Sequence, residues 1–259
     1  MSPKSDVLQR IPLFREMSTA LLGRVAALST LVAVPQGEVL HDRGDSPTVL
    51  NFVLEGRVML TGAAADGTSA VVDVVQPVSG VSLPTVLADL PFPMAARAGV
   101  ASLLVVVTAA PLRALLAQTP ALARAAMQDM AVEFGAMVRQ VLDLKLRSAP
   151  QRLGCYLLEL VVDPAVDQAD FRLPFDKGLL AARLGCRQEN LSRAFATLRD
   201  VGVETHGGRV ILHDIPALRD FAALGPGDER IPAVVLAATQ AGLAGSQTGP
   251  APGEAAKAG

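Results

Sequence analysis

The stretch from Asp176 to Gly202 limits most strongly what this 259-residue chain can fold into. Asp176 precedes a short apolar run that reaches Gly185, and a second run extends from about Gln188 to Gly202. An aspartate can cap the start of a helix, and a glycine readily takes the left-handed conformation that ends one. We therefore expect two helices joined by a turn of three to four residues, which is a helix-turn-helix.

The second of these helices has one apolar and one polar face. Four apolar residues at i, i+3, i+4 and i+7 are expected to form its buried stripe: Leu191, Ala194, Phe195 and Leu198. Its polar residues gather toward the amino-terminal end and comprise Arg187, Gln188, Glu189, Ser192 and Arg193. The first residues of a recognition helix reach base edges in the major groove, where arginine pairs bidentately with guanine. The pattern predicts a DNA-reading surface; the alternative is a solvated face on which Glu189 and Arg193 form an ion pair.

The segment that follows supports the same prediction. Residues 203–212, VETHGGRVIL, are typical of two short strands joined by the turn from His206 to Arg209, which would form a wing. His206 and His213 are expected at the surface near the DNA backbone. The whole chain has a net charge of −2, but residues 172–213 contain seven Lys or Arg against four Asp or Glu. A locally basic module on an acidic chain is typical of a DNA-binding domain.

Residues 31–108 read as short strands separated by turns. The turn signals are PQGE at 35–38, DRGD at 42–45, LEGRV at 54–58 and ADGT at 65–68, with Asp66-Gly67 the strongest hairpin signal. Many short strands at nearly even spacing predict a β-barrel or jelly roll, here preceded by a helix near residues 18–29. The apolar stretch 99–112 is too short to cross a membrane and favours a buried strand, so no membrane partner is expected.

Between these regions the hydrophobic period changes to that of a coiled-coil seam. Six apolar residues are spaced 3, 4, 3, 4 and 3: Met127, Met130, Phe134, Met137, Val141 and Leu144. The favoured interpretation is the interface of a homodimer, where Gly135 would let a partner helix approach closely. The alternative is that this helix packs onto its own β domain, because the run is shorter than three heptads.

Composition restricts the chemistry open to the chain. Its two cysteines, Cys155 and Cys186, lie far apart, so neither an iron–sulfur cluster nor another metal site is expected. No glycine-rich phosphate loop or Ser/His/Asp grouping appears, which argues against catalysis. The amino terminus shows no secretory signal, so a cytoplasmic location is expected. Residues 222–259 are rich in Ala, Gly and Pro and are expected to be largely disordered, with room for a short helix around 233–241.

Together these segments predict an α+β fold with a β-roll at 10–118, a long dimerisation helix at 119–147 and a winged helix-turn-helix at 148–221. This order, with GEVLHDRGD at 37–45, LEGRV and LGCRQENLSRAFATLRDVGV, resembles the family of the cyclic AMP receptor protein and the fumarate and nitrate reduction regulator. The resemblance implies a homodimeric transcription regulator that binds double-stranded DNA and contacts RNA polymerase. Glu189, Ser192 and Arg193 are similar to the nitric-oxide-responsive, Dnr-type branch, which implies TTGAT-like half-sites. The cyclic AMP receptor itself has glycine at the position of Ser192.

The resemblance also bears on the effector. A cyclic nucleotide site in this family needs a Gly-Glu-Leu turn and an Arg-Ser pair for the phosphate. Here Gly80 is followed by Val81 and Ser82, and Phe92 and Pro93 fall near the Arg-Ser position. A buried phosphate without a cation is costly, so cyclic AMP is not expected to bind. The candidate effector pocket comprises Val81, Ser82, Leu83, Phe92 and Met94.

Haem stays open as a cofactor. The segment LPFPMAA gives the pocket an apolar lining that resembles the nitric-oxide-responsive branch. His41 is either a haem ligand, with Met94 as a conceivable thioether ligand, or a solvated loop residue. Three functions remain in competition: an effector-responsive DNA-binding regulator, which is favoured; an effector module whose winged helix docks a protein; and a regulator that does bind a cyclic nucleotide.

Overall fold

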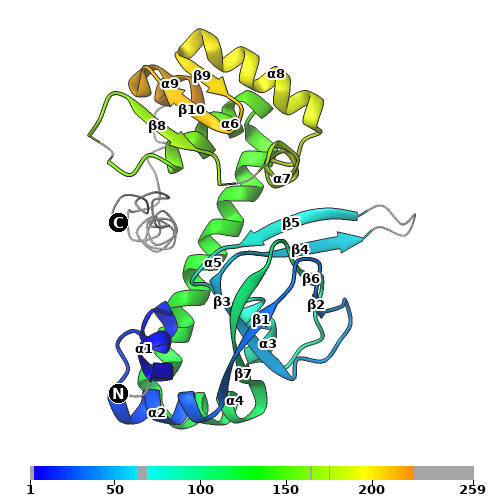
Figure 1. Ribbon diagram of the computed structural model, residues 1–259, viewed down its shortest axis with the longest axis vertical. Helices are drawn as coiled ribbons and strands as arrows, with labels where there is room; N and C mark the ends of the chain where they lie inside the picture. Colours follow the sequence, from blue (N-terminus) through cyan, green and yellow to red (C-terminus); the bar gives the residue numbers. More distant parts are fainter. Residues whose placement is uncertain (1–2, 64–68, 164, 175, 224–259) are drawn as a thin grey trace, which may run out of the picture.

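The computed structural model describes residues 3–63, 69–163, 165–174 and 176–223 (Figure 1). The expected Asp66-Gly67 hairpin turn, the helix expected around 233–241 and all but the first two residues of the expected tail lie outside the described residues. Within them, the predicted α+β class is confirmed: an amino-terminal β-roll, one long helix and a carboxy-terminal winged helix-turn-helix follow one another. Figure 1 shows the long helix running from the β-roll to the carboxy-terminal domain.

Two antiparallel sheets form the β-roll. The first has the order β1 (Ser29–Val34), β7 (Ser102–Thr108), β3 (Val49–Glu55), and the second β2 (Val39–His41), β6 (Ala95–Ala98), β4 (Val58–Ala63), β5 (Ser69–Val75). The PQGE, DRGD and LEGRV turns fall between strands as expected, with the glycines at positive φ. Apolar side chains from both sheets fill the interior, including Val53, Val58, Leu60 and Leu104.

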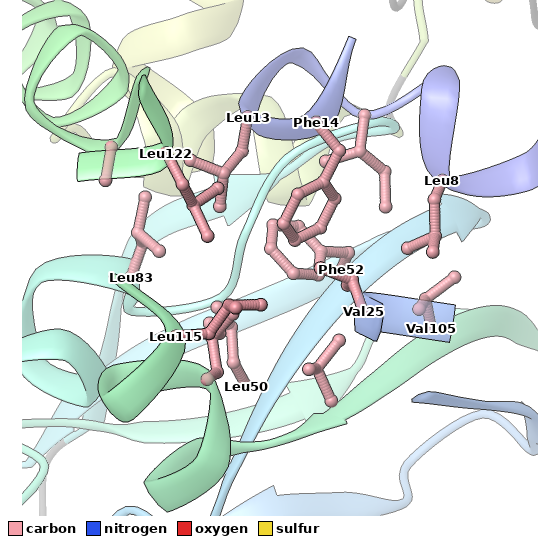
Figure 2. Close-up of a cluster of buried hydrophobic side chains, with 14 of the residues drawn as sticks. Leu8, Leu13, Phe14, Val25, Leu50, Phe52, Leu83, Val105, Leu115 and Leu122 are labelled. Atoms are coloured by element: carbon pink, nitrogen blue, oxygen red, sulfur yellow. The ribbon is translucent and has the colours of Figure 1, made fainter. Parts of the chain in front are cut away.

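Short helices cover the outer face of the first sheet and hold the start of the long helix. They are α1 (Pro3–Gln9), η1 (Pro12–Phe14), α2 (Thr19–Ala27), α3 (Leu83–Ala88) and α4 (Ala109–Gln118), followed by α5 (Pro120–Leu146). The expected helix near 18–29 is α2, which Ser18 caps. Figure 2 shows Phe14 and Phe52 packed together among the leucines, with ring centroids 5.3 Å apart, and Leu122 of α5 entering the same cluster. This core anchors the first turn of α5 to the β-roll.

Gly56, in the turn between β3 and β4, lies at φ +85°, where a side chain is strained. A Cβ atom there would also collide with the Ser102 hydroxyl and stand 2.8 Å from the Ala101 carbonyl oxygen. We expect Gly56→Ala to lower the free energy of unfolding by roughly 2–5 kcal/mol, because backbone strain and overpacking add. Urea unfolding measures this change. The control is Gly37→Ala, at φ +87° with nothing within 4 Å, which should cost about 1–2 kcal/mol; equal losses in the two variants would contradict the packing argument.

The carboxy-terminal domain begins where α5 ends. Ser148 starts a new helix with a capping box to Gln151, and Pro150 fits its first turn. The elements are α6 (Ala149–Glu159), β8 (Ala169–Arg172), α7 (Lys177–Arg183), α8 (Gln188–Leu198), η2 (Arg199–Val201), β9 (Val203–His206), β10 (Arg209–Leu212) and α9 (Ile215–Ala222). A second hydrophobic core unites these helices with the β8-β10-β9 sheet.

Candidate functional site

The helix-turn-helix has the geometry that the sequence predicted. The Asp176 side chain accepts a hydrogen bond from the Leu179 amide at 2.9 Å and so caps α7. Gly185 lies at φ +63° in the turn, and the Cys186 amide closes that turn onto the Ala181 carbonyl at 2.9 Å. Leu191 is 1% exposed and packs in the core between the helices. The two helices are therefore fixed relative to one another by the cap, the turn and a shared core.

The predicted polar end of α8 is exposed. The four expected stripe residues, Leu191, Ala194, Phe195 and Leu198, are all buried, and this turns the opposite face outward. All five predicted DNA-reading residues are exposed: Arg187, Gln188, Glu189, Ser192 and Arg193. In Figure 1, α8 lies on the outer edge of its domain, away from the β-roll. Ser192 donates to the Gln188 carbonyl at 3.1 Å, and no ion pair joins Glu189 to Arg193 in the part of the chain that the structure describes.

The predicted wing is also present. β9 and β10 pair in antiparallel fashion, with His206 opposite Arg209 and Gly207 at φ +62° in the turn. His206 and His213 lie at the surface, and their Nε2 atoms are 2.7 and 2.9 Å from the two carboxylate oxygens of Glu204. The hydrogen bonds from His213 and then His206 lower the pKa of the Glu204 carboxyl. These histidines are engaged with a surface carboxylate of the wing.

The end of α5 contacts the turn of the helix-turn-helix. A Cβ atom added at Gly185 would lie 2.5 Å from Leu144 Cδ2, so the bare glycine lets α5 approach. Arg152 joins the same parts, because its Nε donates to the Leu184 carbonyl at 2.9 Å and its Nη1 to the Arg147 carbonyl at 2.8 Å. The end of α5 is therefore in direct contact with the turn before α8.

The β-roll also contacts this domain through β5. Val74 belongs to the carboxy-terminal core, and Arg183 of α7 lies 3.8 Å from the Asp73 carboxylate. Arg57 Nη1 donates to the Pro174 carbonyl at 3.1 Å. The helix-turn-helix is thus held by contacts from both the sheet and the long helix.

One face of α5 is apolar and uncovered. Of the six predicted seam residues, Met127, Phe134, Met137, Val141 and Leu144 are 65, 68, 63, 54 and 44% exposed. Met130 is the exception, because it packs against the amino-terminal core. Gly135 has nothing within 4 Å of its added Cβ position. The alternative in which this helix buries its seam against its own β domain accounts for Met130 but not for the other five residues.

None of the helices in the described ranges combines the length and apolarity needed to cross a membrane.

Glu133 lies beside this face in a cluster of carboxylates. Burial, together with the nearby charges of Asp129 and Asp73, raises the pKa of Glu133 to about 7. Since the folded state then holds a proton that the unfolded state releases near pH 4.5, stability falls as the pH rises from about 4.5 to 7. Glu133→Gln should remove this loss and stabilise the protein by roughly 1–3 kcal/mol at pH 8 but little at pH 4.

Thermal and urea unfolding of both proteins at the two pH values measure this difference. Glu55→Gln, which removes an exposed carboxylate from β3, controls for net charge. An equal effect of Glu133→Gln at both pH values would contradict the assignment.

The five residues predicted for the effector pocket occupy different environments. Val81 and Leu83 are 1% and 0% exposed and belong to hydrophobic cores, and Ser82 precedes α3 at φ 56°. Met94 packs against the inter-sheet core. Phe92 lines a cavity of about 310 Å³ at one end of the β-roll. The other residues that line it are Leu40, His41, Asp45, Ser46, Thr48, Val49 and Asn51.

His41 is not a solvated loop residue, and that interpretation is wrong. It ends β2, is 7% exposed and stacks on Phe92 with ring centroids 3.5 Å apart and planes 8° apart. Burial lowers the pKa of the imidazole, opposed by the Asp45 charge and the nearby carbonyls of Asp42 and Met94. Neither ring nitrogen has a hydrogen-bond partner among the described residues. Among those same residues, no group of three or more His, Cys, Asp or Glu side chains could hold a metal ion.

The sequence reasoning missed the polar part of this cavity. Asn51 offered a signal, since it is a single amide within the apolar run Val49–Leu54. Asp45 and Ser46 gave none, because the DRGD segment reads only as a turn.

One class of transcription regulators has a β-roll with a ligand-sized cavity, joined by a long helix to a winged helix-turn-helix. In that class, binding of a small molecule controls binding to DNA. Two family models agree with the two ends of this class: residues 31–119 match the cyclic nucleotide-binding domain and residues 151–221 match the Crp-like helix-turn-helix domain. The chain belongs to the CRP/FNR family of transcription regulators.

Solved structures show the same architecture. A protein of Silicibacter pomeroyi DSS-3, named for cAMP binding and regulation, is 25% identical, with 85% of this chain and 98% of that chain covered and a TM-score of 0.57. FixK2 of Bradyrhizobium japonicum is 20% identical, with 75% of this chain and 98% of FixK2 covered and a TM-score of 0.65. The c-di-GMP responsive regulator CLP of Xanthomonas campestris is 19% identical, with 76% of this chain and 99% of CLP covered and a TM-score of 0.61. The last two show the fold alone, and no curated protein sequence matches.

Proposed function

We propose that this protein is a homodimeric, cytoplasmic transcription regulator that reads TTGAT-like half-sites with α8 and contacts RNA polymerase. The observation that carries the proposal is the exposed polar end of α8, held by Asp176, Gly185 and the buried Leu191. A recognition helix needs this arrangement, since its amino-terminal residues enter the major groove. The Glu189 carboxylate can accept a hydrogen bond from a cytosine amino group, and the Arg193 guanidinium can donate two to guanine. The Ser192 hydroxyl can bond to a base or a phosphate.

The exposed face of α5 supports the dimer. Five apolar seam residues at 44 to 68% exposure form a continuous stripe of the kind that marks a protein interface. A second copy of the same helix would bury it by pairing the two stripes. The two recognition helices would then face half-sites one helical turn apart, as a palindrome requires.

The contacts at the end of α5 support effector control. Leu144 against Gly185, and Arg152 between Arg147 and Leu184, make the position of α8 depend on how the two long helices pack. A ligand in the β-roll that favours one packing would shift the population of DNA-competent dimers. No lysine or arginine lines the described cavity, which supports an effector other than cyclic AMP.

Fluorescence anisotropy on a TTGAT-N4-ATCAA duplex tests the proposal. We expect binding as a dimer, at least about tenfold tighter than to a scrambled duplex, and weakening steeply as salt rises. No preference for the palindrome at low salt would overturn the half-site assignment. Absence of any salt-dependent DNA binding would favour the alternative in which the winged helix docks a protein. Addition of haem, with an absorption spectrum as readout, tests the haem alternative in the same preparation.

A further inference from the structure

The cavity at the end of the β-roll has a buried polar floor. Asn51 is 6% exposed, and its side-chain amide has no hydrogen-bond partner within the described part of the chain. His41 and Phe92, at 7 and 5% exposure, complete this floor with two stacked rings. Because the Asn51 amide opens onto a cavity of about 310 Å³ and has no protein partner among the described residues, a bound molecule would supply its hydrogen bond.

The rim of the cavity carries its charge. Asp45, Ser46 and Thr48 are exposed and line the cavity above the floor. One oxygen of the Asp45 carboxylate accepts from the Asp42 amide at 2.8 Å, and the other has no protein donor among the described residues. Asp45 is the acidic group of the lining, and burial lowers the pKa of the His41 imidazole beside it. Arg97 pairs with Asp42 at 3.6 Å, and neither residue is in the lining.

These groups select the charge of a ligand. A molecule that enters the cavity removes water from the Asp45 carboxylate, and no lysine or arginine in the lining replaces that water. An anion would add repulsion, and a neutral molecule would leave the carboxylate poorly compensated. An ammonium group supplies both positive charge and donors, and the Phe92 ring offers an aromatic wall that also favours a cation.

We propose that this cavity binds a small organic cation, with the ammonium group on Asp45 and a hydrogen-bonding group on Asn51. The inference rests on the proposed function, of which it names the effector class. Ser46 and Thr48 accept from the same ammonium group at the rim. The size of the cavity restricts the ligand to a short chain or a single small ring.

Three probes of equal length test the charge preference: 4-aminobutanol, 1,4-butanediol and 4-hydroxybutyrate. Each probe carries a hydroxyl that can bond to Asn51. The opposite end is an ammonium group in the first, a hydroxyl in the second and a carboxylate in the third. Apparent dissociation constants come from the dependence of the melting temperature of the full chain on probe concentration. We expect 4-aminobutanol to bind at least about tenfold more tightly than the diol, and 4-hydroxybutyrate most weakly. Equal binding of the three probes, or binding of none, would overturn the proposal.

Asp45→Asn keeps the size of the side chain and an oxygen for the Asp42 amide. It should weaken 4-aminobutanol about tenfold while leaving the diol unchanged. Asp42→Asn removes the same charge three residues away and should change binding less than about twofold. An unchanged affinity in Asp45→Asn, with an unliganded melting temperature like that of the parent, would overturn the role of Asp45.

The palindrome experiment on the same samples separates the two proposals. Intact DNA binding without any cation binding overturns the cavity assignment and leaves the proposed DNA function standing. If the cation binds but DNA affinity does not change, the cavity does bind organic cations, and its role as the effector site is overturned.

Discussion

Arg193→Ala should weaken binding to the TTGAT palindrome by roughly 5- to 150-fold per half-site, which corresponds to 1–3 kcal/mol. Arg193 is exposed on the second turn of α8, and no ion pair holds it to Glu189 within the described residues. Its guanidinium is therefore available to donate two hydrogen bonds to a guanine. The loss should also relax the preference for guanine at one position of each half-site, because a base contact specifies as well as binds. Anisotropy titrations on the palindrome and on single-base variants measure both effects.

Arg24→Ala is the matched control for this change. Arg24 is an exposed arginine of α2 in the β-roll domain, so its removal changes the net charge equally and leaves α8 intact. It should alter DNA affinity less than about twofold. Equal losses in the two variants would show that Arg193 acts only through net charge. A loss in Arg193→Ala that is uniform across all base variants would place it on a phosphate instead of a base.

Phe134→Glu should convert the dimer to a monomer and remove binding to the full palindrome. Phe134 is 68% exposed at the middle of the apolar stripe, so a dimer would bury one glutamate from each chain side by side. Unpaired like charges in a desolvated seam cost several kcal/mol, which outweighs the gain from one apolar pair. We expect at least about a hundredfold weaker dimerisation. Analytical ultracentrifugation measures the oligomeric state, and anisotropy measures the DNA affinity.

Gln118→Glu introduces the same charge at an exposed position of α4, outside the apolar stripe of α5. It should leave the dimer and DNA binding within about twofold of the parent. A dimer that survives Phe134→Glu would contradict the seam assignment. A monomeric variant that binds the palindrome as tightly as the parent would contradict the proposal that two recognition helices must be held together in a dimer.

The parts of the fold that were predictable depend on local signals. Asp176 and Gly185 mark the helix-turn-helix because a cap and a left-handed turn need particular residues at particular places. The stripe of α8 followed from helical period, and its burial is confirmed. The wing followed from the strand period around Gly207. Each of these features involves residues fewer than about ten positions apart, where backbone geometry controls which side chains share a face.

The cavity proposed to bind the effector was not predictable in this way. It joins the end of β2, the 42–48 turn, the start of β3 and Phe92, which lies some forty residues further along the chain. His41 looked like a turn residue because the polar segment DRGD follows it, but closure of the β-roll places Phe92 over its ring. The predicted pocket residues Val81 and Leu83 have the apolar character expected of a lining, and that same character also fits the cores in which they lie.

The sequence by itself determined the order of the β-roll, long helix and helix-turn-helix, the two faces of α8 and the apolar stripe of α5, because these depend on periodicity, caps and turn glycines. Only the tertiary structure decided which residues far apart in the sequence meet. Leu144 reaches Gly185, Arg152 ties Arg147 to Leu184, and Asn51 and Asp45 share a cavity because the roll and the long helix bring distant segments together. Such contacts are set by packing of the whole chain, and hydrophobic period carries no information about them.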